Sequence, residues 1–153
     1  MAAPEPHLPL SGGCLCGRIR YEVRVQPRSL VVCHCHLCQR RSGSAFGVSM
    51  PVDRQGFAIT KGVAITRVMP GGSGALSTHY YCDECLCRTH SEPSTFPAIS
   101  FVRAGTLDDT SWLQPVAQLW MSSAQTWACV DGILSFEGNA DDPETLRRAW
   151  RER

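Results

Sequence analysis

The sequence predicts a mainly β single domain with short helical turns and a short C-terminal helix. Three observations lead to this prediction. Apolar and polar side chains alternate along several short segments, which is the period of a half-buried strand. Turns rich in glycine and proline separate these segments, and helix-start signals are clearest near the C-terminal end. At 153 residues the chain is long enough for one domain with a sizeable core and too short for two ordinary ones.

The alternation is clearest from residue 18 to residue 25. Ile19, Tyr21 and Val23 fall on one face of this segment, and charged residues fall on the other. Lys61-Gly62 predicts a hairpin-like turn between two later strands, and the Pro-Gly-Gly-Ser-Gly run at residues 70–74 predicts a flexible connection. The further strands are expected at residues 30–32, 45–52, 57–60, 64–68, 78–82, 96–102, 114–121 and 125–130.

Two segments carry helix signals. Residues 36–42 contain no breaker and are followed by Gly43, a common residue just after a helix. Residues 141–150 begin with an aspartate cap and a proline, and acidic residues precede basic ones, as the helix dipole favours. We therefore expect a flexible lead-in at residues 1–10, a folded domain at residues 11–140 and a C-terminal helical tail at residues 141–153.

Composition excludes several classes of partner. The hydrophobic fraction of 43% and charged fraction of 19% are typical of a globular protein. A formal net charge of +1 gives no reason to expect a nucleic-acid or membrane partner. No apolar run approaches the ~20 residues of a membrane span, and the first residues lack the pattern of a signal peptide. We therefore expect a soluble protein of the cytoplasm.

Nine cysteines, an odd number, are unusual for a chain with this expected location. A disulfide framework would leave one cysteine unpaired and would need an oxidising compartment. The cysteines cluster at spacings typical of metal ligands, so metal ligation is the better interpretation.

Cys33, Cys35 and Cys38 fall within six residues of one another. Their sulfurs can converge if the chain wraps a common centre, and Zn²⁺ with thiolate ligands at ~2.3 Å suits such a wrap. Three protein ligands leave one tetrahedral position open, which is the arrangement of catalytic zinc rather than structural zinc. The segment therefore predicts an open zinc site.

A second group is Cys82-x-x-Cys85, which follows a predicted strand as in a zinc knuckle. This pair needs two more ligands, and Cys14 and Cys16, flanked by glycines, can supply them. The four sulfurs would form a closed structural site that joins the first strand to the middle of the chain. In a small β domain the binding energy of such a site is folding energy.

Several motifs together resemble the glutathione-dependent formaldehyde-activating enzyme family, which also contains the vertebrate centromere protein V. The similarity runs from about residue 12 to about residue 136, and the order and spacing of the cysteine groups make it specific for the family. The motifs are Gly-Gly-Cys-Leu-Cys-Gly at 12–17, Cys-His-Cys-x-x-Cys at 33–38, Ser-Gly-Ser-Ala-Phe at 42–46, Tyr-Cys-x-x-Cys at 81–85, Gly-Thr-Leu-Asp-Asp at 105–109 and Trp127.

The resemblance implies a tent-like, mostly β fold with two zinc ions per chain. It assigns Cys14, Cys16, Cys82 and Cys85 to a structural zinc, and Cys33, Cys35 and Cys38 to a catalytic zinc that is held less firmly because it has one ligand fewer. The implied activity is that of a carbon-sulfur lyase, similar to S-(hydroxymethyl)glutathione synthase. The expected partners are a small-molecule thiol such as glutathione and formaldehyde or a related small aldehyde.

Residues next to the three-cysteine segment are candidates for substrate binding. Glutathione carries carboxylates, so Arg40 and Arg41 are candidate clamps, although solvated charges on a helix face are the simpler interpretation of both. Trp112, Trp120 and Trp127 are first of all expected in the core or on a sheet face, and one of them, with Trp127 preferred, is a candidate wall of the pocket. His34 and His36 have the chemistry of zinc ligands or proton carriers, and His34, between two ligands, is better explained as a residue that orients the loop.

Two positions depart from the family pattern. Leu86 and Cys87 stand where the family usually has glycine and a small hydroxyl residue, so we expect the turn to avoid a positive φ at Leu86. Cys87 is best explained as a free thiol, with a spare zinc ligand as the alternative. Cys129, within a predicted strand, is expected to be a core residue.

Two other functions compete with the enzyme. One is a zinc-stabilised binding or scaffolding module, because a shared fold and metal do not transfer a substrate. The other is a thiol-based redox or zinc sensor, because an open, thiolate-rich site can lose its metal on oxidation. Zinc content after mild oxidation distinguishes the sensor from the enzyme.

Overall fold

A computed structural model describes residues 4–153, which form two β-sheets, two α-helices and four short 3-10 turns. The smaller sheet contains β1 (Leu10–Gly13), β2 (Arg20–Val23) and β5 (Phe57–Lys61), all antiparallel. The larger sheet has the strand order β11-β10-β3-β4-β9-β8-β7-β6. Its strands are β3 (Val31–Cys33), β4 (Gly47–Asp53), β6 (Ile65–Pro70), β7 (Leu76–Tyr81), β8 (Arg88–Pro93), β9 (Ile99–Arg103), β10 (Ala117–Leu119) and β11 (Leu134–Ser135). The mainly β prediction is confirmed.

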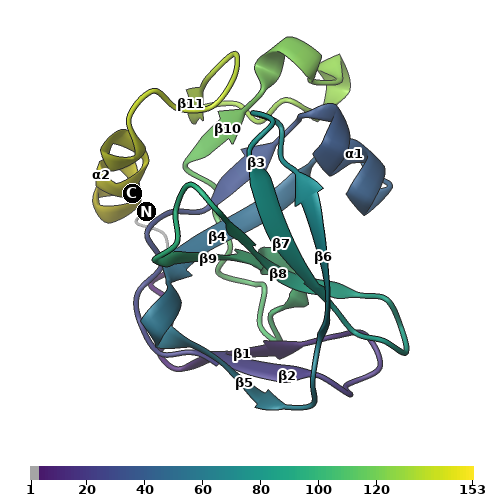
Figure 1. The fold of residues 1–153 in the computed structure, drawn as a ribbon. Coiled ribbons are helices and arrows are strands. Elements are labelled where there is room, and N and C mark those ends of the chain that lie inside the picture. Colours follow the sequence, from purple (N-terminus) through teal and green to yellow (C-terminus); the bar gives the residue numbers. More distant parts are fainter. Residues whose placement is uncertain (1–3) are drawn as a thin grey trace.

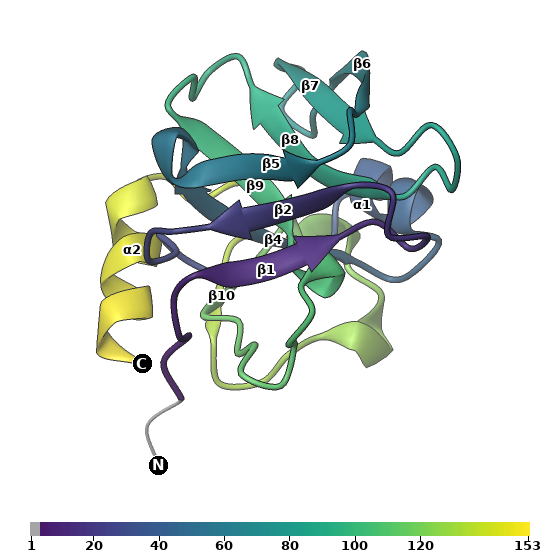
Figure 2. The same ribbon diagram turned by 90° about the horizontal axis from the view of Figure 1, so that it is seen from below.

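The smaller sheet lies across one face of the larger sheet, as Figures 1 and 2 show. The alternation predicted for residues 18–25 explains this packing, because Tyr21 and Val23 of β2 are buried while Arg20 and Glu22 are only partly so. The Tyr21 ring lies 5.2 Å from that of Phe57 in β5. The main core combines both sheets with two tryptophans: Leu10, Tyr21, Val23, Leu30, Met50, Val52, Val102, Ala104, Leu107, Trp112, Val116 and Trp150.

Most of the larger sheet is antiparallel, but β10 pairs in parallel with β3 on one side and with β11 on the other. In this register Leu119 is opposite Cys33, and the backbone N–H of His34 donates to the carbonyl of Leu119 at 2.9 Å. Segments separated by more than eighty residues therefore meet at the start of the three-cysteine loop. This pairing places the chain after β10 beside the predicted zinc site.

The two helices begin and end at local signals. Helix α1 (His36–Ser42) ends at Gly43, whose φ of 61° permits the left-handed turn. Helix α2 (Pro143–Glu152) begins at Asp142, whose side chain accepts the backbone N–H of Glu144 at 2.9 Å. Neither helix has the length and apolar character needed to cross a membrane, among the residues described.

Helix α2 packs on the core through Trp150. Its indole is buried and lies edge-on to that of Trp112, with ring centroids 6.3 Å apart. At the other end of the chain, Leu10 opens β1 and is buried, as is Pro6. The first three residues of the expected lead-in lie outside the described residues.

Two local expectations are wrong. Strands β5 and β6 do not form a hairpin around Lys61-Gly62, because β5 pairs with β2 in the small sheet and β6 pairs with β7 in the large one. Residues 125–130 form a 3-10 turn (Thr126–Ala128) and coil instead of a strand. There the Gln118 side chain, rather than a neighbouring strand, bonds both backbone groups of Val130. Cys129 is consequently exposed and not a core residue.

We expect Trp150→Ala to destabilise the protein by about 3 kcal/mol or more, because truncating a buried tryptophan removes its transfer energy and leaves a cavity. Urea unfolding of the zinc-loaded protein measures the change. Arg148→Ala, at an exposed position of the same helix, should change the free energy of unfolding by no more than about 0.5 kcal/mol. Equal losses in the two variants would mean that α2 does not pack on the core.

A pH dependence of stability is expected from His90, which is 2% exposed and stacks on Tyr80 at 4.1 Å. Burial lowers its pKa from 6.5 to about 4, so between these values the unfolded chain binds more protons than the folded protein. The contribution of His90 to the free energy of unfolding should therefore fall as the pH decreases from 6.5 to 4, by about 1.4 kcal/mol per pH unit. His90→Gln should have a shallower slope in this window in urea titrations, and an unchanged slope would contradict the assignment.

Candidate functional site

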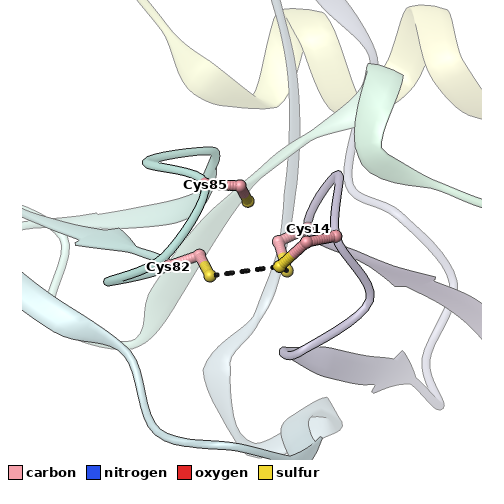
Figure 3. A group of neighbouring side chains, drawn as sticks. Cys14, Cys82 and Cys85 are labelled. Atoms are coloured by element: carbon pink, nitrogen blue, oxygen red, sulfur yellow. Dashed lines mark hydrogen bonds between the residues drawn. The ribbon is translucent and has the colours of Figure 1, made fainter.

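The first candidate metal centre lies where the turn between β1 and β2 meets the turn after β7. Cys14 and Cys16 come from the first turn, and Cys82 and Cys85 come from the second. Figure 3 shows Cys14 of the first turn opposite Cys82 and Cys85 of the second. All four sulfurs lie within 4.8 Å of one another. The Cys16 sulfur is 3.6 Å from that of Cys14 and 3.7 Å from that of Cys82. Sulfurs at the corners of a tetrahedron around zinc, each ~2.3 Å from the ion, are separated by roughly 3.8 Å, so this cluster is compatible with a zinc ion.

Backbone hydrogen bonds fix the turns that carry these sulfurs. Gly17 has a φ of 76°, and the N–H of Ile19 donates to the Cys14 sulfur at 3.2 Å. Backbone N–H groups, first that at Cys16 and then that at Cys87, lower the pKa of Cys85 to about 6. These donors favour the thiolate form that a metal ligand needs.

Leu86 adopts a φ of 58° in the turn after Cys85, so the expectation that this position avoids a positive φ is wrong. The turn keeps its shape because the N–H of Leu86 donates to the carbonyl of Cys82 at 3.1 Å. The Leu86 side chain is 67% exposed and gains little burial in return for this backbone strain. Cys87 packs beside the cluster without belonging to the four converging sulfurs.

The second candidate metal centre is formed by Cys33 at the end of β3, Cys35 just before α1, and Cys38 in the first turn of α1. Their sulfurs also lie within 4.8 Å of one another. The Cys35 sulfur accepts the backbone N–H of Cys38 at 3.4 Å and so caps the helix. Hydrogen bonds from the thiols of Cys33 and Cys38 lower the pKa of Cys35, and the contact with Cys35 raises the pKa of Cys33. The three thiols thus share protons that a divalent cation would replace, and this cluster too is compatible with zinc.

His34 lies between two of these cysteines and is completely buried. Its Nε2 atom is 3.3 Å from the side-chain oxygen of Gln118 in β10. Its carbonyl accepts bonds from Gln39 at 2.7 Å and from the Ser123 hydroxyl at 3.0 Å. These contacts hold the three-cysteine loop against β10, and the orienting role expected for His34 is consistent with them.

A polar surface adjoins Cys38 on the face of the larger sheet that α1 covers. Arg103 of β9 donates to the Ser49 hydroxyl of β4 at 2.6 Å. Its guanidinium passes beside Gly47, where an added Cβ would collide with it and would lie 3.5 Å from the Cβ of Cys38. Glycine at position 47 therefore makes room for a positive charge next to the three sulfurs. Burial lowers the pKa of Arg103, and the nearby thiols, first that of Cys38, act in the opposite direction.

A cavity of about 340 Å³ opens at the start of α1. Trp120 forms part of its wall and has a φ of 60°, which is unusual for a residue other than glycine. The indole N–H donates to the Asn139 side chain at 2.9 Å. The cavity is lined by Cys35, His36, Leu37, Gly72, Trp120, Ser122 and Ser123. The Pro-Gly-Gly-Ser-Gly connection between β6 and β7 thus reaches the three-cysteine site through Gly72.

The candidate substrate residues differ in how much of each side chain is exposed to solvent. Arg40 is exposed, whereas Arg41 is half-buried and donates to the carbonyl of Pro70 at 2.8 Å. Trp127 is 76% exposed, and its indole N–H donates to the side chain of Gln125 at 2.9 Å. The structure therefore places Arg41, whose charge adds to burial in lowering the pKa of His79, beside the polar surface and leaves Arg40 and Trp127 exposed.

Sequence reasoning missed four residues that come from distant strands, namely His79, Arg88, Arg103 and Gln118. None of these four residues belongs to a cysteine motif, although His79 lies in the strand that leads into Cys82. Trp120 is one of the three tryptophans from which a pocket wall was expected, although Trp127 was preferred. Glycine at position 47, just inside a predicted strand, is a weak signal of close approach that could have indicated the position of Arg103.

Comparison with known proteins shows a family and a similar fold. The family model described as "Glutathione-dependent formaldehyde-activating enzyme" matches residues 9–123. A crystal structure of a Rhodobacter sphaeroides protein superposes with a TM-score of 0.53 and 17% sequence identity, covering 82% of this chain and 98% of that one. At this identity the superposition supports the fold alone. No curated protein sequence matches the chain.

Leu86→Gly should raise the free energy of unfolding by about 0.5–1 kcal/mol. Glycine relieves the strain of a positive φ, which costs roughly 1–2 kcal/mol in other residues, and part of this gain is lost to the greater freedom of glycine in the unfolded chain. Leu86→Ala is the matched control because it shortens the side chain but keeps the Cβ. Chemical denaturation at fixed zinc concentration measures both variants, and a gain in the alanine variant equal to that in the glycine variant would contradict the strain argument.

Proposed function

The chain belongs to the family of glutathione-dependent formaldehyde-activating enzymes, and on this premise we propose that it is a zinc-dependent enzyme of the carbon-sulfur lyase type. It joins a thiol such as glutathione to formaldehyde or a related small aldehyde. The observation that carries the proposal is the convergence of three cysteine sulfurs, within 4.8 Å of one another, beside a cavity that Cys35 itself lines.

The two cysteine clusters have different roles in this proposal. Cys14, Cys16, Cys82 and Cys85 supply four ligands, which fill a tetrahedral zinc and suit a structural ion. Cys33, Cys35 and Cys38 supply three, and a fourth position left to solvent or substrate suits catalysis. The cavity opens at the start of α1, where Cys35 and Cys38 also lie. Its position supports the assignment of the three-cysteine cluster, rather than the four-cysteine cluster, to catalysis.

The reaction is the addition of a thiol across a carbonyl group. The sulfur-carbon bond forms, the carbon-oxygen double bond becomes single, and the proton lost by the thiol ends on the oxygen. The reactive species is the thiolate, whereas a free thiol with a pKa near 8.5 is mostly protonated at neutral pH. Zinc held by the three sulfurs would supply a Lewis acid that favours the thiolate or polarises the aldehyde oxygen. The positive charge of Arg103 beside Cys38 offsets the negative charge that three thiolates bring to the site.

The cavity provides the substrate contacts in this proposal. Trp120 forms an apolar wall, and His36 and Ser122 offer polar groups near the sulfurs. Arg40 and Arg41 remain the proposed clamps for a carboxylate, with Arg41 the better placed because it is half-buried toward the polar face. Trp127 is proposed as an outer contact, since Gln125 connects it to Gln39 of α1 at 3.1 Å.

The chemistry also supports a location for the activity. All nine cysteines are free thiols, and the proposed ligands bind zinc only when reduced. A reducing compartment such as the cytoplasm keeps them in that state. We therefore propose that the enzyme acts in the cytoplasm.

The proposal is tested by zinc content and by glutathione-dependent loss of free formaldehyde. The wild-type protein should contain two zinc ions per chain and consume formaldehyde faster than the uncatalysed reaction. Cys38→Ser should remain folded, keep one zinc and lose the acceleration, because it removes a ligand of the open site. Cys85→Ser should compromise folding, because the four-cysteine site joins two turns that are far apart in the sequence.

Cys129→Ser is the matched control, since Cys129 is exposed and outside both clusters. It should keep both zinc ions and the full rate. Two zinc ions without any acceleration would overturn the enzyme proposal and favour a binding module. Loss of folding in both the Cys38 and the Cys85 variant would show that the two sites do not differ in the way proposed.

A further inference from the structure

Four basic side chains gather on the sheet face beside Cys38, and the function proposed above does not explain all of them. Arg41 comes from α1, His79 from β7, Arg88 from β8 and Arg103 from β9. The strand register places His79 and Arg103 on one face, since His79 is opposite Ser91 and Ser91 is opposite Phe101, two residues before Arg103. Arg88 hydrogen-bonds to His79, and burial, with a contribution from the charge of Arg41, lowers the pKa of His79, Arg88 and Arg103. We call these four residues the arginine-histidine patch.

The three arginines of the patch hydrogen-bond to neutral acceptors. Arg41 donates to the Pro70 carbonyl at 2.8 Å, and Arg103 donates to the Ser49 hydroxyl at 2.6 Å. Arg88 donates to Nδ1 of His79 at 2.8 Å. Within residues 4–153, no carboxylate oxygen lies within 4.0 Å of any of these three guanidinium groups. Partly buried cations normally pair with anions, so the patch lacks a counter-ion.

His79 adds an unused hydrogen-bond donor to the patch. Its side chain is 3% exposed, and burial, followed by the charge of Arg88, lowers its pKa to about 4. The imidazole is therefore neutral at pH 7. Because a guanidinium can only donate, Nδ1 of His79 accepts from Arg88 and the ring hydrogen is on Nε2. That buried Nε2–H has no acceptor among the described residues. A buried donor of this kind needs an acceptor.

The charges do not balance within the protein. Three thiolates with one Zn²⁺ carry a net charge of −1, whereas the three arginines carry +3. An anionic ligand would reduce the excess positive charge and accept the free hydrogen of His79. Arg41, Arg88 and Arg103 are each only half-buried, so the patch borders solvent on its arginine side.

We propose that the arginine-histidine patch binds the carboxylate of the thiol substrate while its sulfur occupies the three-cysteine site. This inference rests on the proposed function. The two sites are adjacent, because Arg103 and Cys38 both lie against Gly47. A thiol with a carboxylate a few bonds from its sulfur spans them, whereas a neutral thiol leaves the patch unpaired. The patch thereby selects anionic thiols over neutral ones.

Calorimetric titration of the zinc-loaded full chain tests the proposal with two thiols of equal length, 3-mercaptopropionate and its neutral amide 3-mercaptopropionamide. The wild-type protein should bind the acid about tenfold to a hundredfold more tightly than the amide, the range expected for charge-assisted hydrogen bonds. Arg88→Met should bring this ratio close to one. Arg41→Met, at a half-buried helix position that tolerates substitution better, should reduce the ratio by several-fold. Arg148→Met, an exposed charge on α2, should leave it unchanged.

Propionate, which has no thiol, separates this proposal from the proposed function and from binding of an independent anion. If propionate binds the wild-type protein with measurable heat and Arg88→Met loses this heat, the result supports the patch as a carboxylate site. This holds even if neither thiol reacts with formaldehyde. Propionate binding without any preference for the acid thiol shows a separate anion site and overturns the proposal. Equal affinities for the acid and the amide, without propionate binding, also overturn the proposal. So does an acid-to-amide affinity ratio that stays unchanged in folded Arg88→Met and Arg41→Met.

Discussion

The meeting of two turns through four cysteine sulfurs is the contact on which the rest of the structure depends. One turn joins β1 to β2 in the small sheet, and the other ends β7 in the large sheet, so the sulfurs connect two sheets that are hydrogen-bonded separately. A small second core of Ile19, Cys14 and Cys82 surrounds this contact. Zinc at this point would contribute its binding energy directly to folding. The junction thus joins the two sheets at a second place, in addition to the main core.

Features that depend on a few neighbouring residues were predictable from the sequence. Helix α1 has the bounds expected from its lack of breakers and from Gly43, and the cap at Asp142 starts α2 as expected. The grouping of seven cysteines into a set of four and a set of three was predictable from their spacing, although their binding of zinc remains a prediction. These signals are local because caps, turns and ligand pairs use residues that are close in the chain.

Features that depend on strand order were not predictable. Arg103 and Cys38 are neighbours because β9 pairs with β4 and α1 follows β3, and no local pattern specifies that pairing. The parallel pairing of β10 with β3 joins residues 117–119 to residues 31–33, and it also left residues 125–130 without a strand partner. Register and sheet order arise from side-chain packing over the whole domain, which alternation along one segment does not reveal.

The hydrogen bonds of Gln118 and Trp120 have a consequence for how this site can be altered. Gln118, which contacts His34, is itself held by Val130 and Ser135, and Trp120 is held by Asn139. All three of these anchors lie beyond residue 123, where the family match ends. The wall of the cavity is thus supported by a segment outside the part of the chain that the family model matches. Substitutions in that segment are therefore a way to change the substrate preference while every proposed metal ligand stays the same.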